Sequence, residues 1–92
     1  MHDWVLVCIL FLWEEGGQCR IELRDSSSKK RYINASGVSK LSVPKKEEWG
    51  SSMSINETVG PTKKGDAYYF NIEMQSGDLI ELIADHIDFD WK

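Results

Sequence analysis

Three side chains near the C-terminus have types and a spacing that could do chemistry. The sequence HIDFD alternates His86, Asp88 and Asp90 with apolar residues. On a β-strand they would share one face and could offer an imidazole and two carboxylates to a divalent metal. Same-face neighbours on a strand lie about 7 Å apart, whereas a compact metal site needs converging ligands. We therefore interpret these residues as the solvent face of an amphipathic strand, and we predict no metal and no cofactor.

The other reactive residues also fit structural roles better than catalytic ones. Cys8 lies in an apolar run, without the base or electropositive setting that a nucleophilic thiol needs. His2 is followed by Asp3, which could orient it for acid–base chemistry, but the pair lies at the start of the chain. The carboxylate pairs at 14–15 and 47–48 are expected in turns, and nothing places either pair across a cleft. The sequence contains no phosphate-binding glycine loop, zinc spacing or nucleophile elbow, so we expect no enzyme.

The charge balance excludes several kinds of partner. The chain has 11 Lys and Arg against 15 Asp and Glu, which gives a net charge of −4. An acidic domain does not attract nucleic acid or an anionic membrane surface, so we expect neither as a partner. No basic segment precedes the first apolar run and no small-residue cleavage site follows it. These features predict a cytoplasmic protein without a secretory signal.

The longest apolar run of the chain is 4–13 (WVLVCILFLW), and the other elements have to pack around it. Its β-branched and aromatic residues favour a strand, and it is about half as long as a membrane-spanning helix. Because both of its faces are apolar, both have to be covered. The length of 92 residues predicts one domain, residues 1–92, around a modest core.

A hairpin is predicted next, because Gly16 and Gly17 suit a turn and residues 18–25 alternate between apolar and polar. A turn of two or four residues would place even positions of the first strand on the core face. The predicted core face contains Leu6, Cys8, Leu10, Leu12, Cys19, Ile21 and Leu23. The predicted second face contains Val5, Val7, Ile9, Phe11 and Trp13. This second face needs cover from Ile87, Phe89 and Trp91, or from a second copy in a homodimer. The same register keeps the two cysteines too far apart for a disulfide and predicts two free, buried thiols.

The remaining chain reads as further strands at 31–43, 53–59, 68–74 and 79–91. We predict a bend or bulge at 35–38 that divides the stretch 31–43 into two strands. We also predict loops at 45–52 and 60–66, and a three-residue turn at 75–77. The apolar phase changes near Asp85, which indicates a second bend. A helix over 79–89 is the alternative for the last strand. The total of six to eight short antiparallel strands predicts an all-β fold, as a sandwich, a curved sheet or a small open barrel.

Several residues are candidates for an interaction surface. Trp49 lies in a charged loop, where it either plugs the fold or anchors a partner, and Phe11 and Trp13 belong to the second face of the first strand. Polar residues near turns either bind loop backbone or belong to a site. This polar group consists of Asn56, Glu57, Gln75 and Asp78.

Three pieces of the sequence resemble a known family. They are His2-Asp3 together with Trp13-Glu14, the segment VPKKEEWGSSMSINE at 43–57, and the segment IEMQSGDLIEL at 72–82. Together they resemble small bacterial all-β proteins, the immunity proteins of polymorphic toxin systems of the kind called immunity protein 50. The resemblance implies a cytosolic protein that binds and blocks a toxin domain. The alternative is a homo-oligomeric β domain that binds a small ligand near Trp49.

Overall fold

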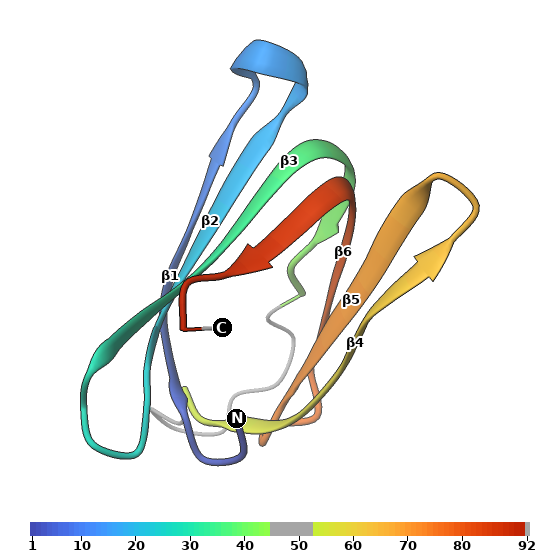
Figure 1. Ribbon diagram of the computed structural model, residues 1–92. Coiled ribbons are helices and arrows are strands. Elements are labelled where there is room, and N and C mark those ends of the chain that lie inside the picture. Colours follow the sequence, from blue (N-terminus) through green and yellow to red (C-terminus); the bar gives the residue numbers. More distant parts are fainter. Residues whose placement is uncertain (45–52, 92) are drawn as a thin grey trace.

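The computed structural model describes residues 1–44 and 53–91, which form one antiparallel sheet of six strands (Figure 1). The strand order across the sheet is β1-β2-β3-β6-β5-β4. The all-β prediction is therefore confirmed, and the helical alternative for 79–89 is wrong. The elements are β1 (Val5–Leu12), η1 (Glu14–Gly16, a 3-10 turn), β2 (Gln18–Arg24), β3 (Lys30–Ser42), β4 (Ile55–Lys64), β5 (Ala67–Met74) and β6 (Leu79–Phe89).

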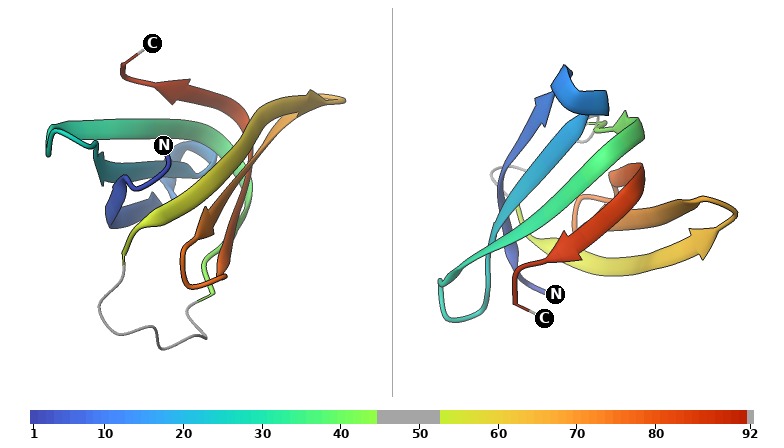
Figure 2. Two further views of the ribbon diagram at one scale, coloured as in Figure 1. Left: turned by 90° about the horizontal axis from the view of Figure 1, so that it is seen from below. Right: turned by 45° about the horizontal axis from the view of Figure 1, so that its top comes forward.

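The sheet is strongly curved, with β1, β2 and β3 on one side and the β4–β5 hairpin on the other (Figure 2). Its two edge strands meet at one end only. There the backbone N–H of Ile55 donates to the carbonyl of Trp4 at 2.8 Å, and the N–H of Leu6 donates to Met53 at 2.9 Å. Beyond Leu6 the edges separate, so the sheet is not closed into a barrel.

β3 and β6 turn a corner together at Gly37 and Asp85. Gly37 has a φ of 63°, and a Cβ built on it would lie 2.7 Å from Cγ of Asp85. Both strands change their inward-facing phase here. In β3, Ile33 and Ala35 pack in the core before the corner and Val38 after it. In β6, Leu82 and Ala84 pack in the core before Asp85, and Ile87 after it. The bends predicted at 35–38 and near Asp85 are thus one corner. The expected division of 31–43 into two strands is wrong, because β3 continues through the corner as one strand, as does β6.

The hairpin between β5 and β6 has the predicted register. The N–H of Met74 donates to the carbonyl of Asp78 at 2.9 Å across a three-residue turn, in which Gly77 has a φ of 95°. Ile72 then lies opposite Ile80, and Phe70 opposite Leu82. All four side chains are buried.

The predicted parity of β1 is wrong over most of the strand. The connection to β2 spans five residues, 13–17, so that Phe11 lies opposite Cys19 and Ile9 opposite Ile21. Ile9 and Phe11 therefore pack against the core. A register shift between Leu6 and Cys8 then returns Leu6 to the core face, opposite Leu23. An odd-length turn and a bulge together reverse the expected faces.

The core lies inside the curve of the sheet. Its buried residues are Cys19, Ile21, Leu23, Ile33, Ala35, Ile55, Phe70, Ile72, Met74, Ile80, Leu82 and Ala84. The last residues of the chain close it, since Phe89 and Trp91 stack at 4.8 Å and the ring of Trp91 meets that of Trp4 at 5.2 Å. Phe89 and Trp91 thus pack against the same core as Ile9 and Phe11, as the predicted cover of the second face requires. Val7 and Trp13 of that predicted face remain exposed.

The segment 60–66, expected as a loop, is largely strand. β4 continues through Pro61 to Lys64 and forms a long hairpin with β5, in which Lys64 lies opposite Ala67. The single apolar face expected for 53–59 is also absent, because a register shift follows Ile55 and leaves Val59 54% exposed. Within residues 1–44 and 53–91 there is no helix long and apolar enough to span a membrane.

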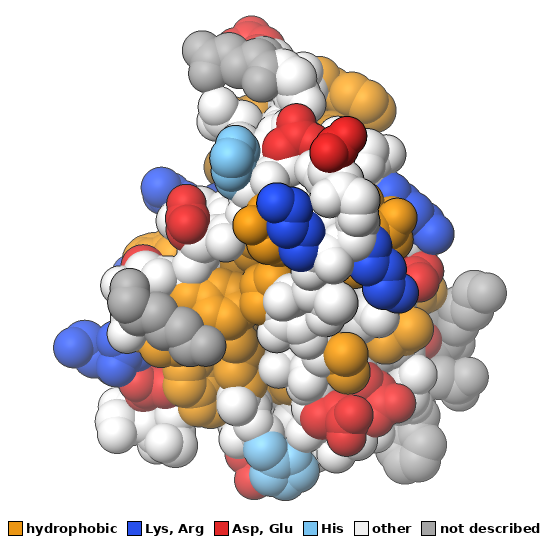
Figure 3. Space-filling view, turned by 45° about the vertical axis from the view of Figure 1, so that its right-hand side comes forward, with side chains coloured by type: hydrophobic (Ala, Val, Ile, Leu, Met, Phe, Trp, Pro, Cys, Tyr) orange, Lys and Arg blue, Asp and Glu red, His pale blue; other side chains and the backbone are white. Residues whose placement is uncertain are grey.

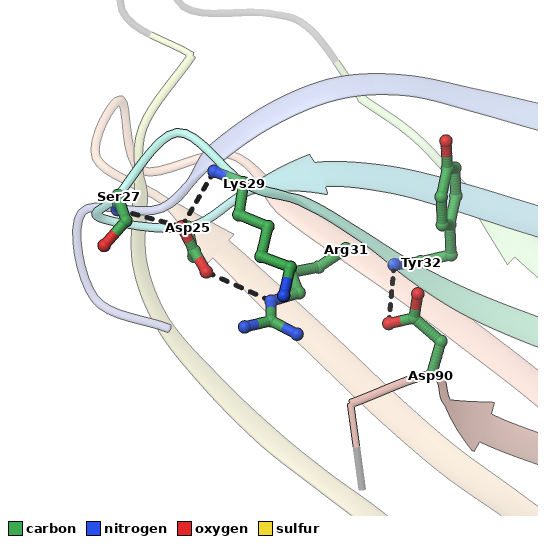
Figure 4. Close-up of polar contacts among 6 residues, drawn as sticks. All are labelled: Asp25, Ser27, Lys29, Arg31, Tyr32 and Asp90. Atoms are coloured by element: carbon green, nitrogen blue, oxygen red, sulfur yellow. Dashed lines mark hydrogen bonds and ion pairs between the residues drawn. The ribbon is translucent and has the colours of Figure 1, made fainter.

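The polar turn between β2 and β3 is organised by Asp25 (Figure 4). Its carboxylate accepts hydrogen bonds from the backbone N–H groups of Ser27 and Lys29 and from Nε of Arg31. The bond from Lys29 lowers the pKa of this carboxyl most; partial burial opposes that effect, and Ser27 and Arg31 lower the pKa further. Arg31 is thus engaged within the turn.

Candidate functional site

Large apolar side chains are exposed along β1 and directly after it. The exposed fractions are 40% for Val7, 53% for Leu10, 48% for Leu12 and 86% for Trp13. We call these four residues the β1 surface. Trp13 lies just beyond the strand and its ring meets that of Phe11 edge-on, with centroids 4.9 Å apart. Of the two aromatic candidates here, Trp13 is thus accessible, while Phe11 packs partly against the core.

A shallow groove of about 410 Å³ lies beside the β1 surface, on the side of the sheet that faces away from the core. One cross-strand row runs through it, from Leu10 on β1 to Arg20, Asn34 and Asp88 on β2, β3 and β6. The groove is lined by Leu10, Leu12, Gln18, Cys19, Arg20, Asn34, Ala35, Ser36 and Asp88. It therefore combines an apolar wall with a polar floor.

Arg20 is the cation of this groove. Its Nε donates to Oδ1 of Asn34 at 3.0 Å, and its guanidinium lies over the ring of Tyr32, 5.3 Å from the centroid. These contacts hold a side chain that is otherwise exposed. An exposed, pre-oriented guanidinium next to leucines is a combination that protein interfaces favour, because arginine gives both charge-assisted hydrogen bonds and packing area.

A second hollow lies where β6 leaves β5. It has a volume of about 270 Å³ and is lined by Pro61, Ile87, Asp88 and Phe89. In Figure 3 hydrophobic side chains gather in a hollow of the face that is drawn, with acidic and basic side chains around it. The hollow beside Phe89 is smaller than the groove at Arg20, and Phe89 is the one aromatic residue that lines it.

The three residues considered for a metal do not form a ligand set. His86 and Asp88 lie exposed on β6, whereas Oδ1 of Asp90 accepts a hydrogen bond from the backbone N–H of Tyr32 at 3.0 Å (Figure 4). Among residues 1–44 and 53–91, no group of three or more His, Cys, Asp or Glu side chains is placed to hold a metal ion.

All three pieces of the sequence that carry the family resemblance meet at the start of β4. Nδ1 of His2 lies 2.7 Å from the carbonyl oxygen of Asn56. Nε2 of Gln75 donates to Oδ1 of Asp3 at 2.6 Å, and Nδ2 of Asn56 donates to Glu73 at 2.6 Å. Asn56 and Gln75 therefore hold the N-terminus against the β4–β5 hairpin, which is a structural role for both.

The other polar candidates differ in exposure. Asp78 is 9% exposed, and its carboxylate accepts a hydrogen bond from the hydroxyl of Ser76 at 3.1 Å within the 75–77 turn. Glu57 is exposed on β4, opposite Glu73. Trp49 and the carboxylate pair at 47–48 lie outside the described residues.

Both cysteines are free thiols, but their surroundings differ. Cys8 is exposed on β1, which corrects the expectation that it is buried. Cys19 is buried, and burial raises the pKa of its thiol to about 11. The difference follows from the reversed parity of β1, since Cys8 points to the same side of the sheet as Leu10 and away from the core.

In comparisons with protein-family models, with curated proteins and with solved structures, nothing matches this chain. The function of the groove and of the β1 surface is therefore inferred from the residues that form them. Sequence reasoning identified Trp13 but missed Leu10, Leu12 and Arg20. The clean alternation of residues 18–25 already placed Arg20 on a polar face, and only the register joins that face to the exposed side of β1.

Proposed function

We propose that this protein is a non-catalytic binding module that holds a protein partner against the groove at Arg20 and the β1 surface. The observation that carries the proposal is the position of exposed apolar side chains, Leu10 and Leu12, directly beside an oriented guanidinium. Leucines left in water contribute free energy when a partner covers them, at about 25 cal/mol per Å² of apolar surface. Arg20 would supply direction by pairing with a carboxylate or carbonyl of the partner.

The family resemblance gives this proposal its partner class. Its sequence pieces imply an immunity-type inhibitor that occludes the domain of a bacterial toxin in the cytoplasm. Two free thiols support a reducing compartment, because secreted domains of this size commonly pair their cysteines. The net charge of −4 suits a basic partner surface, although it is small.

Affinity purification of the tagged protein from its native cells tests the proposal. We expect one stoichiometric protein, identified by mass spectrometry, that also binds when both proteins are purified. Recovery of no protein other than the bait would contradict it. Purification of the bait without a partner, together with a raised melting temperature in a metabolite library, would support the alternative of a small-ligand domain. The groove volume of about 410 Å³ is in the range of such sites.

A further inference from the structure

The edge of β1 beyond Leu6 has no neighbouring strand among the described residues. β1 is the outermost strand on its side of the sheet, and an isolated bridge from Val5 to Ser54 marks the end of its contact with the start of β4. The register shift between Leu6 and Cys8 separates this contact from the remainder of the strand. An edge strand presents unpaired backbone N–H and C=O groups to which another strand can bond.

The two edges of the sheet differ in how they are protected. β4, the opposite edge, contains Pro61, exposed Lys63 and Lys64, and two register irregularities. Proline, lysine and bulges are the features by which natural sheets prevent edge pairing. β1 has no proline and no charged residue from Val5 to Leu12, and its single irregularity lies before the open part. The open part of β1 therefore carries none of these protective features within the strand, and no described strand covers it, while the other edge of the same sheet is guarded.

The open part of β1 is also complementary to itself. In an antiparallel pair centred on Leu10, that residue would face its own copy, Cys8 would face Leu12, and Ile9 would face Phe11. Every pair is apolar, and each joins residues on the same side of the sheet. Cross-strand pairs of this kind stabilise a sheet, whereas like charges placed opposite each other destabilise it. The β1 strand of a second copy is thus a suitable partner for the open part of β1.

We propose that two copies of this chain form a dimer in which their β1 edges pair antiparallel around Leu10, so that the two sheets become continuous. This inference goes beyond the proposed function and does not rest on it. Edge pairing uses backbone groups of β1 and leaves Arg20 and Asn34 accessible on the outer side. The dimer would place two grooves side by side across a shared apolar strip.

Sedimentation equilibrium of the untagged protein measures the assembly. We expect a mass of twice the 10.6 kDa of one chain. Leu10→Lys should weaken dimerisation at least about tenfold, because it places two like charges opposite each other at the centre of the pair. Val59→Lys is the matched control, since Val59 is 54% exposed on the guarded edge, and it should remain a dimer. Circular dichroism should show both variants folded.

A wild-type protein that remains a monomer at high micromolar concentration would overturn the inference, even if it captures a partner, and would leave the proposed function standing. A dimer that Val59→Lys dissociates and Leu10→Lys does not would overturn it as well. Disulfide trapping tests the register. In a Cys8→Ser background, Leu10→Cys should form a cross-linked dimer under mild oxidation and Val59→Cys should not. The opposite pattern would contradict pairing around Leu10.

Discussion

Replacing Phe70 by alanine is expected to lower the free energy of unfolding by about 3–5 kcal/mol. Phe70 is 1% exposed and is among the largest fully buried side chains of the described residues. Its ring meets that of Phe89 edge-on, with centroids 5.4 Å apart, so the loss would leave a cavity between β5 and the end of β6. Domains of this size have total stabilities of about 5–15 kcal/mol. Urea unfolding should therefore show a much lower midpoint.

Tyr69→Ala is the control for this change. Tyr69 is the sequence neighbour of Phe70, is 38% exposed and faces the other side of the sheet, where Lys64 lies 5.3 Å from its ring centroid. Its loss should cost less than about 1 kcal/mol, because an exposed cation–π contact contributes little. Equal effects of the two substitutions would contradict the assignment of the two faces of β5.

Ile9→Lys is expected to destabilise the fold by roughly 2–4 kcal/mol, whereas Leu10→Lys should cost less than about 1 kcal/mol. Ile9 lies opposite Ile21, which is fully buried, and packs against the core. Leu10 is 53% exposed on the other side of the strand. A lysine at position 9 would bring an unpaired charge toward the core, while one at position 10 would remain in water.

Thermal and urea unfolding of the two variants check this difference. The comparison is made at protein concentrations at which the wild type is monomeric, because Leu10→Lys would oppose edge pairing more strongly than Ile9→Lys; the difference then reports the packing of the single chain. A larger loss of stability for Leu10→Lys than for Ile9→Lys would contradict this assignment of the faces. It would instead support Leu10 on the core face, as a two- or four-residue turn predicts.

The parts of the fold that follow from the sequence are those with an unambiguous alternation. In β5 and β6 only one face of each strand is apolar, so the turn at Gly77 and the pairing of Ile72 with Ile80 could be derived. The residues at 35–38 and the phase change near Asp85 likewise indicated two bends, although not that Gly37 and Asp85 meet in one corner. Positive φ at Gly37, next to the Asp85 side chain, is a tertiary requirement.

The register of β1 could not be derived, because the strand is apolar on both faces and its sequence gives no parity signal. Its faces depend on a 3-10 turn at Glu14–Gly16 and on the register shift after Leu6, neither of which has a distinct local pattern. The same error in register assigns Leu10 and Leu12 to the core, so the groove that they line could not be predicted. The predicted strand at 53–59 ends earlier than β4 for a related reason. Pro61 indicates a loop, yet an edge strand tolerates a proline.

The most direct test of the binding surface compares Arg20→Glu with Arg24→Glu. Both arginines are exposed residues of β2 on the same side of the sheet, but only Arg20 lines the groove. The affinity of each purified variant for the captured partner can be measured by isothermal titration calorimetry. We predict that Arg20→Glu weakens binding by at least about tenfold, as expected for an interface arginine, and that Arg24→Glu leaves it within about twofold. Equal affinities of the wild type and Arg20→Glu, or a loss confined to Arg24→Glu, would contradict the assignment of the groove as the partner site.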